Sequence, residues 1–380
     1  MRRPAHGGNL AWAAALADCS PSAIVDFSAS INPLGPPESV IRAIHSQIGN
    51  LRHYPDPECG DLRLALSHFH RLPQEWILPG NGSAELLTLA GRELGQLAAT
   101  VLLTPAFGDY YRALRAFDAN VLEFSLMERK EWGVSSSEID FSGKSISGKS
   151  ISEKYISSLS TSLPIPHSRF AKSGLLLNNP HNPTGFVFSK EEILPYLNCF
   201  DLVVVDEAFM DFLPPNQQES LIDVVQDYPN LVILRSLTKF YSLPGLRLGY
   251  AITNPDRVKL WQKWRDPWSV NSLAQYAAIA AIEDTEFQHR TLSWLPLARN
   301  QLFQGLLHIP GLQPFPGSVN YLLVQSQEPS SQLQQKLLKQ YKVLIRDCLS
   351  FAELGENFFR VAVLSESDNN RLLTALKERN

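Results

Sequence analysis

Short apolar runs alternate with stretches of helical periodicity along most of the chain, and this pattern predicts an α/β fold. Wholly apolar runs of this length are typical of strands buried in a parallel sheet. In chain order these runs are Val101–Leu103, Gly174–Leu177, Leu202–Val205 and Leu231–Leu234. The predicted helices extend from about Glu38 to Ile48, from Gly60 to Pro73 and, as one long stretch, from Ser272 to about Arg299.

A separate α/β unit is predicted at the carboxyl end, with strands near Tyr321–Val324, Val343–Ile345 and Phe358–Val363. The chain of 380 residues is long enough for two domains, or for one large α/β domain with an appendage. Near the amino end, Leu10–Ala17 is apolar but short, and Asp18 stands where signal-peptide cleavage prefers a small neutral residue. We therefore expect a short helix capped by Asn9 rather than a targeting signal.

Residues 134–168 break the pattern, because serine dominates there and the hydrophobic periodicity fades. We expect a flexible surface insertion. Within it, Gly143 to Ser150 matches the phosphate-loop pattern GxxxxGK[ST]. A true phosphate loop needs a buried strand before it, and the preceding serine-rich residues cannot form one. A nucleotide site here is therefore only a minor alternative.

The composition excludes several classes of protein. Hydrophobic residues make up 44% and charged residues 19%, which supports a sizeable core. A net charge of -4 gives no reason to expect nucleic acid or an anionic membrane as partner. The four cysteines form no CxxC pair and suggest reduced thiols, not a disulfide frame or a metal site. Since no stretch is long enough to cross a membrane, we expect a cytoplasmic protein.

Three successive apolar strands are followed by polar side chains of different chemistry: Asn182, Asp206 and Lys239. Each also has a simple structural explanation: Asn182 can be an amide in a turn, Asp206 a helix cap, and Lys239 a lysine in a basic loop. Together they lie at the carboxyl ends of parallel strands, where α/β proteins bind ligands. An acid, an amide and an amine are what a pyridoxal phosphate ring requires at its nitrogen, phenolic oxygen and aldehyde.

Residues that could hold a phosphate lie nearby in the predicted fold. Ser236, Thr238 and Arg247 surround Lys239 in the sequence, and nearby positive charge lowers a lysine pKa. Gly82 and Ser83 form a Gly-rich turn that opens a helix, which is also a common anion site. Either feature alone also fits a simple loop or cap.

Aromatic and basic residues complete the candidate site. Tyr110 follows the strand at Val101–Leu103, and Tyr54 is an exposed aromatic in a Pro-rich loop. His6-Gly7-Gly8-Asn9 places flexible backbone beside an imidazole at a helix start, which suits an anion but also a plain loop. Arg346 and Arg360, in the carboxy-terminal unit, suit bidentate capture of a carboxylate or phosphate, although single surface arginines are common.

On these residues the chain resembles the fold-type-I pyridoxal-phosphate enzymes, in particular the histidinol-phosphate aminotransferase group. The resemblance implies the aspartate-aminotransferase-like fold, with an amino-terminal arm (1–50), a large cofactor-binding domain (51–270) and a small carboxy-terminal domain (271–380). It also implies pyridoxal 5'-phosphate as the cofactor, a small phosphorylated amino acid as substrate, and a homodimer.

The same resemblance implies a role for each residue. Lys239 would form the Schiff base, Asp206 would hold the ring nitrogen, Asn182 would face the phenolic oxygen and Tyr110 would stack on the ring. The implied cofactor-phosphate ligands are Gly82, Ser83, Ser236, Thr238 and Arg247, with Tyr54 from a partner subunit. The implied substrate contacts are His6, Gly7, Gly8, Asn9, Asn32, Arg346 and Arg360.

Within the group, the chain is more similar to the threonine-phosphate decarboxylases of cobalamin biosynthesis than to the aminotransferases. The amino-terminal His6–Asn9 segment and the motifs around Arg346 and Arg360 carry this similarity. Phe209 stands where the aminotransferases usually have a tyrosine, which leaves Asn182 a larger share in holding the cofactor oxygen. We expect decarboxylation of L-threonine O-3-phosphate, with transamination of histidinol phosphate as the alternative.

A serine acyl-transfer enzyme is a further alternative from another class. The motifs Ser236-x-x-Lys239, Ser367-Asp368-Asn369 and Lys172-Ser173-Gly174 are those of penicillin-recognising enzymes. Their order along the chain is wrong, because Lys-Ser-Gly should come last. This alternative is therefore weak.

Overall fold

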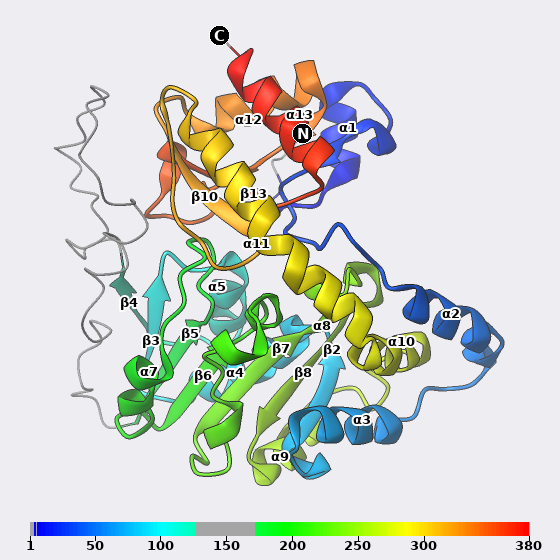
Figure 1. The fold of residues 1–380 in the computed structure, drawn as a ribbon. Helices are drawn as coiled ribbons and strands as arrows, with labels where there is room; N and C mark the ends of the chain where they lie inside the picture. The colour runs from blue at the N-terminus through cyan, green and yellow to red at the C-terminus, as the bar shows by residue number, and fades with distance from the viewer. Residues whose placement is uncertain (1–3, 5, 127–171, 380) are drawn as a thin grey trace.

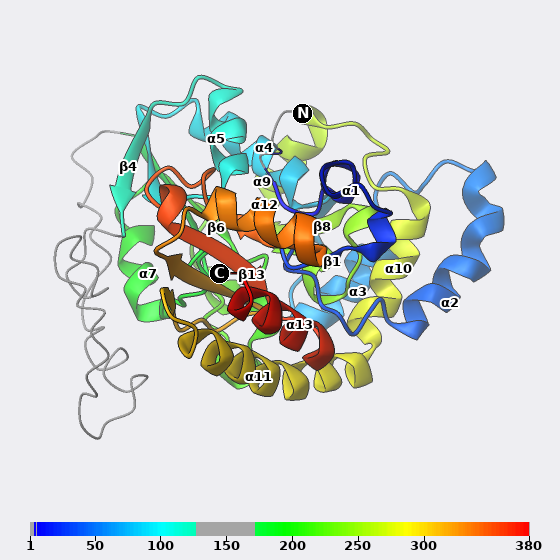
Figure 2. The same ribbon diagram turned by 90° about the horizontal axis from the view of Figure 1, so that it is seen from above.

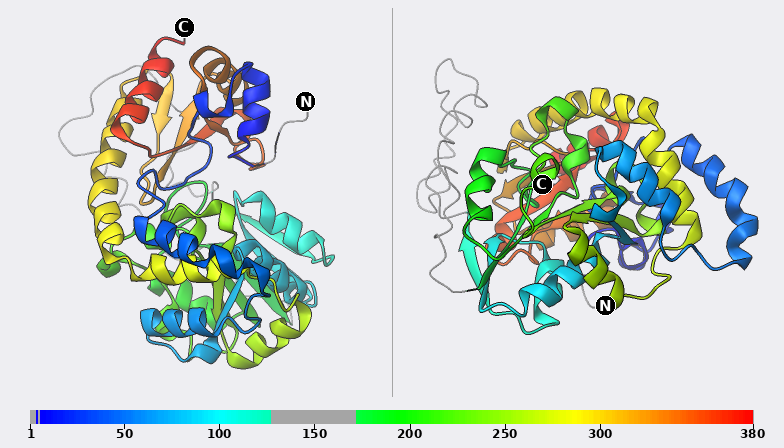
Figure 3. Two further views of the ribbon diagram at one scale, coloured as in Figure 1. Left: turned by 90° about the vertical axis from the view of Figure 1, so that its right-hand side faces the viewer. Right: turned by 90° about the horizontal axis from the view of Figure 1, so that it is seen from below.

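A computed structural model describes residue 4, residues 6–126 and residues 172–379 (Figure 1). The predicted insertion at 134–168, with its Gly143–Ser150 pattern, lies outside the described residues. The described chain has two lobes, and a long helix, α11 (Thr285–Leu307), runs from one to the other (Figures 1 and 3). None of the described helices is long and apolar enough to cross a bilayer.

The larger lobe is built on a seven-stranded sheet with the order β2-β8-β7-β6-β5-β3-β4. Its strands are β2 (Ile77–Asn81), β3 (Ala99–Thr104), β4 (Val121–Ser125), β5 (Ser173–Asn178), β6 (Leu202–Asp206), β7 (Leu231–Ser236) and β8 (Leu248–Thr253). The four predicted apolar runs are strands, as expected. Strand β8 was not among the predicted strands; it is antiparallel to both β2 and β7.

Both faces of this sheet are covered, which explains why its strands are wholly apolar. Alternate residues along β6 and β7 belong to two separate cores: Val203 and Ile233 to one, Val204 and Val232 to the other. The described helices of this lobe include α3 (Gly60–His70), α4 (Ser83–Leu94), α5 (Gly108–Arg115), α7 (Lys190–Leu197), α8 (Leu237–Phe240) and α9 (Pro255–Trp264).

The predicted helix at 272–299 is in fact two helices. The first is α10 (Ser272–Glu283), and the second is α11, whose first turn is capped by the Asp284 carboxylate accepting from the Phe287 N–H. Helix α10 packs against α2 (Glu38–Gln47) and α3. The predicted domain boundary near residue 270 stays a prediction, and α10 itself packs with helices that precede that boundary.

The smaller lobe holds a four-stranded antiparallel sheet with the order β12-β13-β10-β9. Its strands are β9 (Leu312–Pro314), β10 (Tyr321–Ser326), β12 (Arg346–Asp347) and β13 (Phe358–Ala362). Helices α11, α12 (Ser330–Tyr341) and α13 (Glu366–Lys377) pack on this lobe (Figure 2).

The amino-terminal segment joins the smaller lobe. Helix α1 (Leu10–Ala17) has the predicted cap, since the Asn9 side chain accepts a hydrogen bond from the Trp12 N–H at 2.9 Å. It packs on α12, and the short strand β1 (Val25–Asp26) pairs in parallel with β11 (Val343–Leu344). The first and last parts of the chain therefore build one lobe together.

Candidate active site

The three strands whose ends carry Asn182, Asp206 and Lys239 lie side by side. Strands β5, β6 and β7 are parallel neighbours, so their carboxyl ends meet at one edge of the sheet. Asp206 ends β6, Lys239 lies in α8 directly after β7, and Asn182 lies in the loop that follows β5. The sequence predicted this convergence from the order of the apolar runs.

Asp206 is held by two hydrogen bonds at the end of its strand. One carboxylate oxygen accepts from the Tyr110 hydroxyl at 2.9 Å, and the other accepts from the Ala208 N–H at 3.0 Å. Burial raises the pKa of Asp206, and these two hydrogen bonds together with the nearby Lys239 ammonium oppose the rise. The structure thus joins Tyr110 to Asp206 through its hydroxyl; stacking of its ring on a cofactor stays a prediction.

Lys239 has an environment that favours its neutral, nucleophilic form. Its Nζ donates to the Thr238 hydroxyl at 3.0 Å. Burial lowers the pKa of Lys239 to about 8, helped by the positive charges of Arg247 and Arg360 and opposed by Asp206. A lysine with its ordinary pKa is almost wholly charged at pH 7, whereas here about a tenth of the amine is uncharged and able to attack a carbonyl.

The predicted phosphate ligands form a compact cradle beside Lys239. Helix α4 begins at Ser83, and Gly82 just before it has a positive φ of 75°. This backbone conformation strains any residue with a side chain, and a Cβ at Gly82 would also lie 2.6 Å from the Arg247 guanidinium, which would have to move. The Ser236 and Thr238 hydroxyls lie 2.8 Å apart on the neighbouring segment. A helix amino terminus, an arginine and two hydroxyls fit the phosphate of pyridoxal phosphate.

The two predicted substrate arginines are direct neighbours in the smaller lobe. Arg346 on β12 is opposite Arg360 on β13 in an antiparallel pair, so both side chains leave the same face of the sheet. Both are buried, at 4% and 8% exposure. Burial lowers the pKa of Arg360, and the Arg346 charge adds to this effect. Two buried cations on one face favour binding of an anion between or beside them.

Arg360 also connects the two lobes. Its Nη1 donates to the Asn182 side-chain oxygen, and its guanidinium lies 4.7 Å over the Tyr321 ring. Arg346 donates to the Ser350 hydroxyl at 2.6 Å. Thus Arg360 reaches the edge of the large sheet where Asp206 and Lys239 lie, and its charge lowers the pKa of Lys239.

The His6–Asn9 segment lines a groove together with Arg346. Other residues of this groove include Trp12, Ser28, Gln334 and Asp347. The His6 ring packs on Phe107 with a centroid distance of 5.3 Å. Burial lowers the pKa of His6, and the nearby Arg346 adds to this shift while Asp109 opposes it. The predicted phosphate-binding segment and Arg346 are therefore brought to one place.

Two predicted site residues have other contacts in the described chain. The Asn32 side chain donates to the Phe240 carbonyl and to the Thr291 hydroxyl, both at 2.9 Å, and its oxygen accepts from the Leu34 N–H. Asn32 thus anchors the amino-terminal arm beside α8, and its contact with substrate stays a prediction. Tyr54 is 81% exposed and packs on Trp268, with a ring-centroid distance of 4.8 Å.

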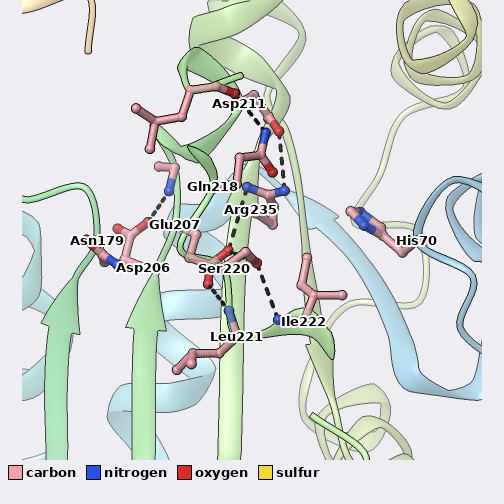
Figure 4. Close-up of polar contacts among 12 residues, drawn as sticks. His70, Asn179, Asp206, Glu207, Asp211, Gln218, Ser220, Leu221, Ile222 and Arg235 are labelled. Carbon is pink, nitrogen blue, oxygen red and sulfur yellow. Dashed lines mark hydrogen bonds and ion pairs between the residues drawn. The ribbon is translucent and has the colours of Figure 1, made fainter. Parts of the chain in front are cut away.

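A buried ionic cluster, which the sequence pattern did not predict, is formed by Arg235, Asp211 and Glu207 (Figure 4). Arg235, 2% exposed, lies 3.3 Å from Asp211 and 3.6 Å from Glu207. The Glu207 carboxylate also accepts from the Ser220 hydroxyl and the Leu221 N–H. Two features of the sequence point to this cluster: Arg235 stands between the apolar run 231–234 and Ser236, and Glu207 is a second acid directly after Asp206.

With this fold and site, the chain belongs to the family of class I and II aminotransferases, whose pattern it matches over residues 22–376. Among individual proteins, it is similar both to decarboxylases and to aminotransferases of this family. It is 35% identical over 378 residues to the threonine-phosphate decarboxylase of Salmonella typhimurium, covering 98% of this chain and 96% of that protein. It is 34% identical over 306 residues to a histidinol-phosphate aminotransferase of Ralstonia nicotianae, covering 80% and 74%.

The fold is also similar to that of two solved enzymes. The histidinol-phosphate aminotransferase from Clostridium acetobutylicum superposes with a TM-score of 0.76 at 27% identity, covering 92% of this chain and 97% of that one. The L-threonine-O-3-phosphate decarboxylase from Porphyromonas gingivalis also has a TM-score of 0.76, at 23% identity, and covers 93% and 98%. These likenesses confirm the predicted aspartate-aminotransferase-like architecture.

Proposed function

We propose that this chain is a pyridoxal-phosphate-dependent carboxy-lyase that converts L-threonine O-3-phosphate into (R)-1-amino-2-propanol O-phosphate for cobalamin biosynthesis. The observation that carries this proposal is the pair of buried arginines, Arg346 and Arg360, on one face of β12 and β13 beside the His6–Asn9 groove. A substrate with a carboxylate and a phosphate supplies two anions of the kind that arginines bind with paired hydrogen bonds. The similarity to the decarboxylase over nearly the whole chain supports the same choice.

The residues that would hold the cofactor are those of the cradle and the sheet edge. Gly82, Ser83, Ser236, Thr238 and Arg247 would hold its phosphate. Asp206, Asn182 and Tyr110 would surround the ring, since they meet at the ends of β5 and β6 and the start of α5. Bound pyridoxal phosphate supplies an electron sink for the electron pair that the leaving carboxylate releases.

The chain's own residues would orient the substrate and handle its protons. Arg360 would bind the carboxylate, while Arg346 and the His6–Asn9 backbone would bind the phosphate. Lys239, with a pKa near 8, can hold a proton and return it to the substrate carbon after carbon dioxide leaves. Because Arg360 and Tyr321 are buried, little water would reach a substrate bound beside them, which would strengthen these electrostatic contacts.

The assay separates decarboxylation from transamination. The purified protein with pyridoxal phosphate is given L-threonine O-3-phosphate, and released carbon dioxide is measured. In a parallel sample, histidinol phosphate and 2-oxoglutarate are supplied, and glutamate is measured. Carbon dioxide without glutamate supports the proposal; glutamate without carbon dioxide would make the chain a histidinol-phosphate aminotransferase, which the similarity to the Ralstonia enzyme makes the second candidate.

We also propose that the enzyme is a cytoplasmic homodimer in which Tyr54 reaches the cofactor phosphate of the partner. Tyr54 and Trp268 form an exposed aromatic pair, and Leu51, in the segment just before Tyr54, is 59% exposed. Aromatic groups of this kind are enriched at subunit interfaces. No disulfide bond joins the four cysteines, all of which lie in the described part of the chain, as suits a reducing compartment. Light scattering gives the subunit number, and Tyr54→Ala should weaken cofactor binding.

A further inference from the structure

Ser28 connects the two anion-binding parts of the proposed site. Its hydroxyl accepts a hydrogen bond from the Gly8 N–H at 2.8 Å, and its carbonyl oxygen lies 3.5 Å from Nη2 of Arg360. Gly8 belongs to the segment beside Arg346, whereas the charge of Arg360 acts on Lys239. Ser28 is 2% exposed and is therefore itself fixed in the interior.

The orientation of the Ser28 hydroxyl is determined by Asp26. One oxygen of the Asp26 carboxylate accepts both the Ser28 N–H at 2.8 Å and the Ser28 hydroxyl proton at 2.5 Å. A serine hydroxyl has one proton and two lone pairs. Because the Ser28 hydroxyl donates its proton in the hydrogen bond to Asp26, its lone pairs point elsewhere and one accepts from the Gly8 N–H. Asp26 thus makes Ser28 an acceptor with a fixed direction.

The backbone around Ser28 is equally constrained. The Phe27 N–H donates to the Leu344 carbonyl at 2.8 Å, and the Ala362 N–H donates to the Phe27 carbonyl at 2.9 Å. Phe27 therefore lies between β11, which comes just before Arg346, and the end of β13, which contains Arg360. A Cβ at Gly7 would lie 2.2 Å from the Ser28 carbonyl oxygen, so the amino-terminal segment rests directly on Ser28. Small shifts of Ser28 must move Gly7 and Gly8.

We propose that Ser28 is a positioning residue that fixes the distance between the phosphate-binding segment and the carboxylate-binding arginine. It thereby selects amino acids whose phosphate lies close to the α-carboxylate, as in threonine phosphate. This inference rests on the proposed function and assigns the choice of substrate length to the Asp26–Ser28–Gly8 hydrogen bonds. No covalent step is attributed to Ser28.

The test uses the holoenzyme and three substitutions. Ser28→Ala removes the acceptor for Gly8, and Asp26→Ala releases the hydroxyl from its fixed orientation. Ser326→Ala is the matched control, because Ser326 is also buried and its hydroxyl accepts a backbone N–H, that of Glu328 at 3.1 Å, away from the proposed site. The measurements are kcat and KM for threonine phosphate and homoserine phosphate, the inhibition constant of inorganic phosphate, and the visible spectrum.

Ser28→Ala is expected to raise KM for threonine phosphate and the inhibition constant of phosphate by roughly five- to tenfold, the effect of one lost hydrogen bond. The preference for threonine phosphate over the longer homoserine phosphate should fall by a similar factor. Because Ser28 does not touch the cofactor cradle, kcat and the visible spectrum should change less than about twofold. Asp26→Ala should act in the same direction with a smaller effect.

Several results would overturn the inference. One is a Ser28→Ala enzyme whose KM, phosphate inhibition and substrate preference match those of Ser326→Ala. Another is a loss confined to kcat with an altered visible spectrum, which would indicate general damage. If the wild-type enzyme releases no carbon dioxide, the proposed function fails by itself. Calorimetric titration with inorganic phosphate then still decides the role of Ser28. If Ser28→Ala does not fold, Asp26→Ala is read by the same criteria.

Discussion

Replacing Arg235 by methionine should destabilise the protein strongly, because it leaves two carboxylates without their cation. Arg235 is the cation found 3.3 Å from Asp211 and 3.6 Å from Glu207. The side chains of Arg235 and Glu207 are 3% and 0% exposed, and that of Asp211 is 12% exposed. Water therefore has little access to solvate the two carboxylates once the arginine is gone. Methionine keeps most of the length of the arginine stem, so the main change is electrostatic.

The expected magnitude follows from the burial of this cluster. Removing one partner of a buried ion pair costs about 3–5 kcal/mol. An unfolding entropy of about 2.1 cal/mol/K per residue gives roughly 0.8 kcal/mol/K for a chain of this length. A loss of about 4 kcal/mol thus corresponds to a fall in Tm of about 5 °C.

The loss should depend on pH in a defined direction. Burial raises the pKa of Glu207 and of Asp211, and the Arg235 charge opposes both rises. Without Arg235 both folded-state pKa values move further above the unfolded value of about 4. The folded state then binds more protons than the unfolded state, so stability falls as pH increases through that range. The Arg235→Met deficit should be smaller near pH 5 than near pH 8.

Urea and thermal unfolding at these two pH values measure the effect. Lys259→Met is the matched control, since Lys259 pairs with Asp256 at the surface, where the pair is worth less than about 1 kcal/mol. A triple variant with Arg235→Met, Glu207→Gln and Asp211→Asn should recover part of the loss, because no unpaired charge remains. The reasoning is refuted if Arg235→Met is as stable as the control, or if the triple variant is no more stable than Arg235→Met.

Three further outcomes are expected at the cofactor site. Labelling of Lys239 by pyridoxal phosphate and borohydride should rise with pH through about 8, since the Lys239 pKa is lowered to that value. In Arg247→Gln, measured at saturating cofactor, the midpoint of this rise should move to higher pH. An unchanged midpoint would contradict the effect of the Arg247 charge. Gly82→Ala should weaken cofactor binding roughly tenfold in equilibrium dialysis, because a Cβ would meet Arg247 at a positive φ. Asp206→Asn should lower kcat for carbon dioxide release at least about a hundredfold, and wild-type turnover would argue against its role.

The sequence by itself determined the parts of this protein that depend on local periodicity. The apolar runs ending at Val205 and Leu234 predicted buried strands, and the polar residues after them were therefore expected at one sheet edge. The cap of α1 by Asn9 was equally readable, because a capping side chain acts within one turn. These local signals were enough to predict the fold class and the group of residues around Lys239.

The tertiary structure decided what depends on pairing between distant parts of the chain. The antiparallel placement of β8, the opposition of Arg346 and Arg360, and the contact of Ser28 with Gly8 all follow from strand register and lobe packing. No local pattern encodes which residues face each other across strands, since the register is set by the whole core. The sequence thus predicted that Lys239 forms a Schiff base with a carbonyl. The structure brought together Arg346, Arg360 and the His6–Asn9 backbone, which would select the substrate.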